Sequence, residues 1–135
     1  MGRTQTHALV LISARELASN MATAMFVIDS KGVLVFYNEA AEELLGLAFA
    51  DSGPLKSSEW GTKWNPRSPD GSSVRLEDLP ISIALQKQKP AHSPLLITGS
   101  DGVDRTIAIT AFPLFAKVGE LAGAVAIFWE DPAGQ

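Results

Sequence analysis

The chain has 135 residues, a length that suits one domain, and it contains no cysteine, which excludes a disulfide framework, a thiolate metal site and a cysteine nucleophile. Its formal net charge of −4 argues against nucleic acid as a partner, because such a partner needs a basic face. The apolar run near the N-terminus is too short to span a bilayer and the basic residues are scattered, so we expect no membrane contact and a cytoplasmic location.

The N-terminal residues 6–22 are predicted to form an amphipathic helix. Its apolar stripe has spacings of four, three and four, and it consists of Val10, Ala14, Leu17 and Met21. Leu9, Ile12 and Ala18 widen this stripe. The helix could pack on its own domain alone or on a partner subunit as well, and the wide stripe favours both at once.

The next segment combines a hairpin with a short helix. Two runs rich in β-branched and aromatic residues, at 25–28 and 33–37, flank the sequence Asp-Ser-Lys-Gly, which predicts two strands and a tight turn. Asn38 is expected to cap the helix that follows, since its side chain can accept from a free N–H of the first turn. Gly46 is expected to end that helix in the left-handed conformation.

In this order and spacing, the unit resembles the start of a PAS domain, the sensory module of many bacterial signalling proteins. The resemblance rests on Val27, Ile28, Asp29, Gly32, Leu34, Phe36, Asn38, Ala40, Ala41, Leu44, Leu45 and Gly46. A generic hairpin and helix from another α+β domain is the alternative.

Regular periodicity is absent from Ala48 to Ser73, apart from a possible helical turn near 57–60. Trp60 and Trp64 argue that this long loop is ordered, because burying two indoles stabilises it. They either pin the loop to the core, which is the simpler interpretation, or form part of a lid over a pocket.

A helix is predicted over residues 78–89, with Asp78 as its N-cap and Pro80 in its first turn. The sequence Leu-Pro followed by Ala84 and Leu85 is similar to a subset of bacterial PAS domains fused to kinases and cyclases. This similarity implies a signalling protein of kinase or cyclase type as a partner.

Three further strands are predicted at 93–98, 105–115 and 121–129. The resemblance then covers about residues 20–131 and implies an α+β fold: a five-stranded antiparallel sheet with short helices on one face and the N-terminal helix over the other. We therefore divide the chain into the N-terminal helix (1–22), the PAS domain (23–131) and a tail (132–135). Whether the domain is free-standing or excised from a longer protein stays open.

Strand alternation, with the resemblance, predicts which residues face the concave side of the sheet and could contact a ligand. These residues are Phe26, Ile28, Val35, Tyr37, Ile83, Leu95, Ile97, Ile107, Ile109, Ala126 and Phe128. The single hydroxyl in this set belongs to Tyr37. Such a surface suits a small apolar or amphiphilic ligand, such as a fatty acid, oriented by one or two hydrogen bonds. A packed core without a cavity is the alternative.

Motifs for catalysis or metal binding are missing from the sequence, so we expect no enzymatic activity, and a small α+β enzyme is the rival hypothesis. Haem-binding relatives use a histidine on the central helix, whereas the nearest histidine here, His92, comes after it. Flavin-binding relatives use a cysteine and polar strand residues, at positions where Ile97, Ile107 and Phe128 stand here. We therefore expect neither haem nor flavin.

The convex face of the sheet is predicted to be as apolar as the concave one. It would carry Met25, Val27, Leu34, Phe36, Val125, Ile127 and Trp129. One helix covers only part of such a face, so a homodimer is predicted. Its interface would contain Val10, Ala14, Leu17, Met21 and Trp129. A sensory module that binds a ligand and a ligand-free interaction scaffold both remain open.

Overall fold

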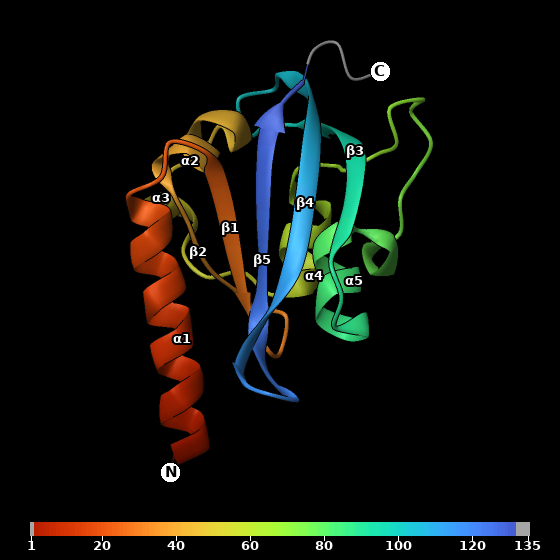
Figure 1. Cartoon of the computed structure of the whole chain (residues 1–135). Helices are drawn as coiled ribbons and strands as arrows, with labels where there is room; N and C mark the ends of the chain where they lie inside the picture. The colour runs from red at the N-terminus through yellow and green to blue at the C-terminus, as the bar shows by residue number, and fades with distance from the viewer. Residues whose placement is uncertain (1, 132–135) are drawn as a thin grey trace.

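The computed structural model describes the backbone of residues 2–131 and the side chains of residues 7–131, so the predicted tail at 132–135 lies outside the described residues. Five strands and several short helices follow the long first helix (Figure 1). The elements are α1 (Gly2–Ser19), β1 (Ala24–Asp29), β2 (Leu34–Tyr37), α2 (Glu39–Leu45), α3 (Phe49–Ser52), α4 (Ser57–Lys63), the 3₁₀ helix η1 (Leu76–Asp78), α5 (Pro80–Lys87), β3 (Ala91–Thr98), β4 (Asp104–Lys117) and β5 (Glu120–Glu130).

The five strands form one sheet in the order β2-β1-β5-β4-β3, and every neighbouring pair is antiparallel. Helix α1 packs on one face, and the short helices pack on the other, where α5 contacts β3, β4 and β5 (Figure 1). Two separate hydrophobic clusters fill these two layers. The predicted α+β fold, with helices on both faces of an antiparallel sheet, is confirmed.

The turn between β1 and β2 forms for local reasons. The Asp29 carboxylate accepts hydrogen bonds from the backbone N–H groups of Lys31 and Val33, at 2.9 and 3.0 Å. Gly32 has a φ of +84°, which a residue with a Cβ rarely adopts. The predicted glycine turn is confirmed.

The register between β1 and β2 differs from strict alternation. Val27 pairs with Phe36 and Ile28 with Leu34, so Val35 is an extra residue in the strand, a β-bulge. Leu34 is therefore fully buried on the concave side, and Val35 packs against the cluster under α1. The predictions that Val35 faces the concave side and Leu34 the convex side are wrong, because each extra residue reverses the faces on one side of it.

Helix α1 ends at Ser19, so Met21 lies beyond it rather than on its stripe. The side of α1 that faces the sheet carries Leu11, Ala14 and Ala18. Small residues let the helix approach the strands closely. Leu17, predicted on the apolar stripe and in the dimer interface, is 59% exposed.

Helix α5 begins later than predicted. Its N-cap is Leu79 and its first residue is Pro80, while the carboxylate of Asp78 accepts a hydrogen bond from Arg75 at 3.1 Å. The prediction that Asp78 caps the helix is wrong. Ile81 and Ala84 are buried against the sheet, and Ile83, which lies about half a turn from Ile81, is only half-buried.

Candidate ligand-binding cavity

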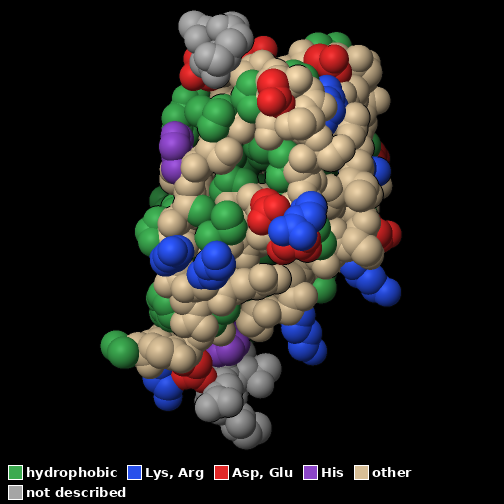
Figure 2. All heavy atoms as spheres, turned by 90° about the vertical axis from the view of Figure 1, so that its right-hand side faces the viewer, with side chains coloured by type: hydrophobic (Ala, Val, Ile, Leu, Met, Phe, Trp, Pro, Cys, Tyr) green, Lys and Arg blue, Asp and Glu red, His purple; other side chains and the backbone are tan. Residues whose placement is uncertain are grey.

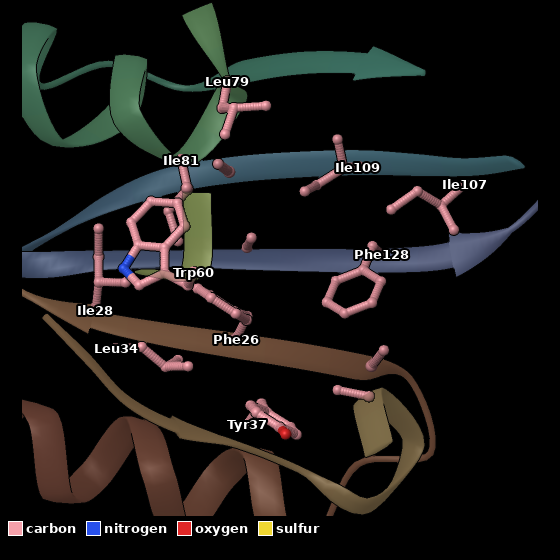
Figure 3. Packing of buried hydrophobic residues seen from close by; sticks show 14 of the residues in the cluster. Phe26, Ile28, Leu34, Tyr37, Trp60, Leu79, Ile81, Ile107, Ile109 and Phe128 are labelled. Atoms are coloured by element: carbon pink, nitrogen blue, oxygen red, sulfur yellow. The ribbon is translucent and has the colours of Figure 1, made fainter. Parts of the chain in front are cut away.

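A cavity of about 80 Å³ lies in the layer between the concave face of the sheet and the short helices. Every residue that lines it is apolar, and the lining consists of Phe26, Leu45, Trp60, Trp64, Pro66, Leu79, Pro80, Ile81, Leu95, Ile97, Ile107, Ile109, Ala126 and Phe128. On the side of the molecule that carries β3 and α5, hydrophobic side chains gather between charged ones (Figure 2). Figure 3 shows Phe26, Ile109 and Phe128 on neighbouring strands, with Leu79 and Ile81 on the helical side.

The structure brings most of the predicted ligand-contacting residues together. Those that line the cavity are Phe26, Leu95, Ile97, Ile107, Ile109, Ala126 and Phe128. Ile28 and Tyr37 are fully buried in the same cluster but do not line the cavity. Val35 lies on the opposite face of the sheet, and Ile83 is outside the lining.

The lining residues that strand alternation missed come from loops and helices. They are Leu45, Trp60, Trp64, Pro66, Leu79, Pro80 and Ile81. The two tryptophans were the signal in the sequence that pointed to these residues. They are buried in the core, and they form part of the wall of the cavity.

Both indole N–H groups are held by the surrounding chain. Nε1 of Trp60 donates to the carbonyl of Gly32 at 2.9 Å, and Nε1 of Trp64 donates to Oγ of Ser100 at 3.1 Å. The ring of Phe26 lies edge-to-face with both indoles, at centroid distances of 5.6 and 6.4 Å. These contacts fix the aromatic wall of the cavity in place.

Two arginines lie close to the lining. Arg105, which pairs with Ile97 across β3 and β4, donates to the carbonyl of Leu44 and to Asp101, each at 2.9 Å. This guanidinium lowers the pKa of the Asp101 carboxyl below its usual value. Arg67 donates to the carbonyl of Asn65 at 2.7 Å.

The hydroxyl of Tyr37 donates to the carbonyl of Leu47 at 2.8 Å, so it is already committed. Burial raises the pKa of this phenol above its ordinary value of 10.0, and the negative charges of Glu42 and Asp51 act in the same direction.

We expect the folded protein to form tyrosinate only above pH 10, and the urea-unfolded chain to form it near pH 10. Because the pKa of Tyr37 is higher in the folded protein than in the unfolded chain, the neutral phenol favours the folded state. This contribution to the free energy of unfolding is fully present below the unfolded pKa and is lost as pH rises through the folded pKa. Tyr37 is the only tyrosine, so a titration of tyrosinate absorbance reports on it alone. A Tyr37→Phe variant supplies the baseline, and ionisation of the folded protein at or below pH 10 would contradict the expectation.

The described side chains, residues 7–131, include no group of three or more His, Asp or Glu that could hold a metal ion. His92 is exposed on β3, and its Nδ1 lies 3.1 Å from Oγ1 of Thr110 on the convex face. No helix among the described residues is long and apolar enough to cross a membrane.

A second hollow, which we name the α1 groove, has a volume of about 400 Å³ and lies between α1 and the convex face of the sheet. Its lining consists of Leu9, Val10, Ser13, Ala14, Leu17, Met25, Phe112, Leu114 and Val125. It thus contains three of the predicted interface residues. Met21 packs against the neighbouring buried cluster, and Trp129 is 44% exposed at the far end of β5.

Comparison with known proteins agrees with this architecture. The model of the family described as PAS domain matches residues 15–80, and no curated protein matches the chain. The chain is similar to the PAS domain of a protein from Colwellia psychrerythraea, with a TM-score of 0.65, 16% identity, and coverage of 90% of this chain and 97% of that one.

Two other solved structures are similar. The PAS domain of nitrogen regulation protein NR(II) from Vibrio parahaemolyticus has a TM-score of 0.60 and 16% identity, with coverage of 87% of this chain and 97% of that one. A Rhodobacter sphaeroides LOV protein has a TM-score of 0.67 and 12% identity, with coverage of 100% of this chain and 71% of that one. At these identities the similarity is one of fold.

Proposed function

The chain belongs to the PAS domain family, whose members are sensory and signal-transduction modules, and from this premise we propose that it binds a small apolar or amphiphilic ligand in the cavity and signals as a non-catalytic homodimer. The observation that carries this proposal is the apolar cavity behind the sheet. A protein partner of kinase or cyclase type would receive the signal.

The sheet offers a direct route from the cavity to α1. On β5, Ala126 lines the cavity, while its neighbour Val125 lines the α1 groove on the other face. On β1, Phe26 lines the cavity and Met25 lines the groove in the same way. A ligand that shifts either strand therefore acts on the contact with α1.

Native mass spectrometry of protein purified from cells tests the ligand part. We expect a reproducible bound mass, and a raised melting temperature with members of a panel of hydrocarbons and lipids, because a ligand that binds only the folded state stabilises it. Ala126→Leu fills the cavity and should abolish the shift. Ala108→Leu adds the same atoms at a half-buried position of β4 on the opposite face of the sheet, and this variant should retain the shift in melting temperature. An empty protein without any shift would favour the ligand-free scaffold.

The dimer part rests on exposed apolar side chains along α1. Leu9, Ile12 and Leu17 are 63%, 53% and 59% exposed, and Ser13 is the only polar residue in the lining of the α1 groove. The exposed side chains of α1 in one copy can enter the α1 groove of a second copy, and a two-fold axis makes the two contacts identical. Large exposed apolar patches usually mark an interface.

We expect Leu17→Glu to raise the dimer dissociation constant at least about tenfold, because each copy would place a charge in an apolar contact. Light scattering over a concentration series measures this. Val103→Glu, an exposed apolar residue in the β3–β4 turn, is the matched control and should leave the dimer intact. A wild-type protein that stays monomeric at high concentration would contradict the dimer.

A further inference from the structure

We propose that the cavity selects compact, uncharged molecules without hydrogen-bonding groups and rejects carboxylates and long acyl chains, an inference that rests on the proposed ligand-binding function. It narrows the ligand from small apolar or amphiphilic molecules to the apolar ones alone. Three properties of the site lead to it, namely its hydrogen-bonding groups, its charges and its size.

The side chains around the cavity have no hydrogen bond to offer. Of the residues in the lining, only Trp60 and Trp64 carry a polar side-chain atom, and both indole N–H groups already donate to Gly32 and Ser100. The hydroxyl of Tyr37, the residue expected to orient a ligand, donates to Leu47. A hydroxyl or carboxyl group of a ligand that lies against this lining would therefore find no free side-chain partner there, which opposes binding.

The nearby arginines do not provide an anchor for an anion. Arg105 holds Asp101 through Nη2 and Nη1 of its guanidinium, at 2.9 and 3.3 Å, and Nη1 also donates to the carbonyl of Leu44. Nη2 of Arg67 lies 3.7 Å from the carboxylate of Asp104. A ligand carboxylate would have to displace an aspartate from its guanidinium, so a fatty acid gains no net ion pair.

The size of the cavity sets an upper limit. At about 80 Å³ it is roughly half of the about 150 Å³ of an engineered apolar cavity that binds benzene or xenon. Xenon and hydrocarbons of a few carbons fit as the structure stands. A benzene ring requires the lining side chains to move, and a long acyl chain exceeds the space.

The three tryptophans provide a spectroscopic readout, since the indole N–H signals of Trp60 and Trp64 report on the cavity and that of exposed Trp129 serves as an internal control. The wild-type protein is titrated with xenon, propane, benzene, phenol, benzoate and decanoate, and indole signals are followed by heteronuclear NMR. We expect xenon, propane and benzene to shift Trp60 and Trp64 saturably and to leave Trp129 in place. Phenol should bind at least about tenfold more weakly than benzene, and benzoate and decanoate should not shift the cavity signals.

The possible results separate the two proposals. If decanoate or benzoate shifts Trp60 and Trp64 with an affinity equal to that of benzene, ligand binding stands and the selectivity proposed here is overturned. If none of the six compounds shifts these signals, the cavity is no binding site for molecules of this kind, and both proposals fail. Ala126→Leu should remove the xenon response and Ala108→Leu should retain it, with circular dichroism to verify that each variant is folded.

Discussion

Alanine at position 123 is expected to lower the free energy of unfolding by about 3 kcal/mol or more. A Cβ on Gly123 would stand 2.1 Å from the carbonyl oxygen of Ile28, which belongs to the backbone of the adjacent strand β1. No side-chain rotation relieves this contact, so β1 and β5 must separate at the end of their pairing, where Asp29 lies opposite Gly123. Urea unfolding monitored by circular dichroism measures the loss.

Gly119→Ala is the matched control for this prediction. Gly119 has a φ of +75°, but nothing lies within 4 Å of the position that its Cβ would occupy. The control should cost only the strain of the left-handed conformation, about 1–2 kcal/mol. Equal losses in the two variants would show that the contact with Ile28 is not the cause.

The second large effect is expected at Asn38, which is 2% exposed and whose side-chain amide makes four hydrogen bonds to the backbone. Its Oδ1 accepts from the backbone N–H groups of Met25 and Ala41, at 3.0 and 3.1 Å, and the second bond caps α2. Its Nδ2 donates to the carbonyls of Ala18 and Thr23, at 2.8 and 2.9 Å. One amide thus fastens the end of α1 to β1 and to the start of α2.

Asn38→Ala is expected to cost about 3 kcal/mol, since it removes a helix cap and leaves buried backbone groups without partners. Amide hydrogen exchange should also speed up along α1, because the carbonyl of Ala18 loses its link to the sheet. Asn20→Ala removes an exposed amide, just beyond the end of α1, that donates to the carbonyl of Glu16 in the last turns of that helix. It should change stability by less than about 0.5 kcal/mol, and a comparable loss there would argue against a special role for Asn38.

The turn at Asp29, the cap at Asn38 and the left-handed Gly46 were all predictable from the sequence and are confirmed. Each depends on atoms a few residues apart in the chain, so local stereochemistry is sufficient. The inward orientation of Ala126 and Phe128 was equally predictable, because β5 keeps strict alternation in this part of the sheet.

The tertiary structure decided the features that depend on distant segments. The extra residue at Val35 moves Leu34 into the core, and a count of alternating positions cannot reveal a bulge that depends on pairing with β1. The late start of α5 turns Ile81 rather than Ile83 toward the sheet.

The presence of a cavity could also not be predicted from the sequence. A composition of apolar side chains describes a filled core and a hollow one equally well, since the space left over depends on how side chains from different elements pack. Trp60 and Trp64 enclose the cavity because their indoles are held by Gly32 and Ser100, and neither partner is adjacent to them in the chain. The sequence determined the fold and the apolar character of the site, whereas long-range packing determined its size, its lining and its lack of free hydrogen-bonding groups.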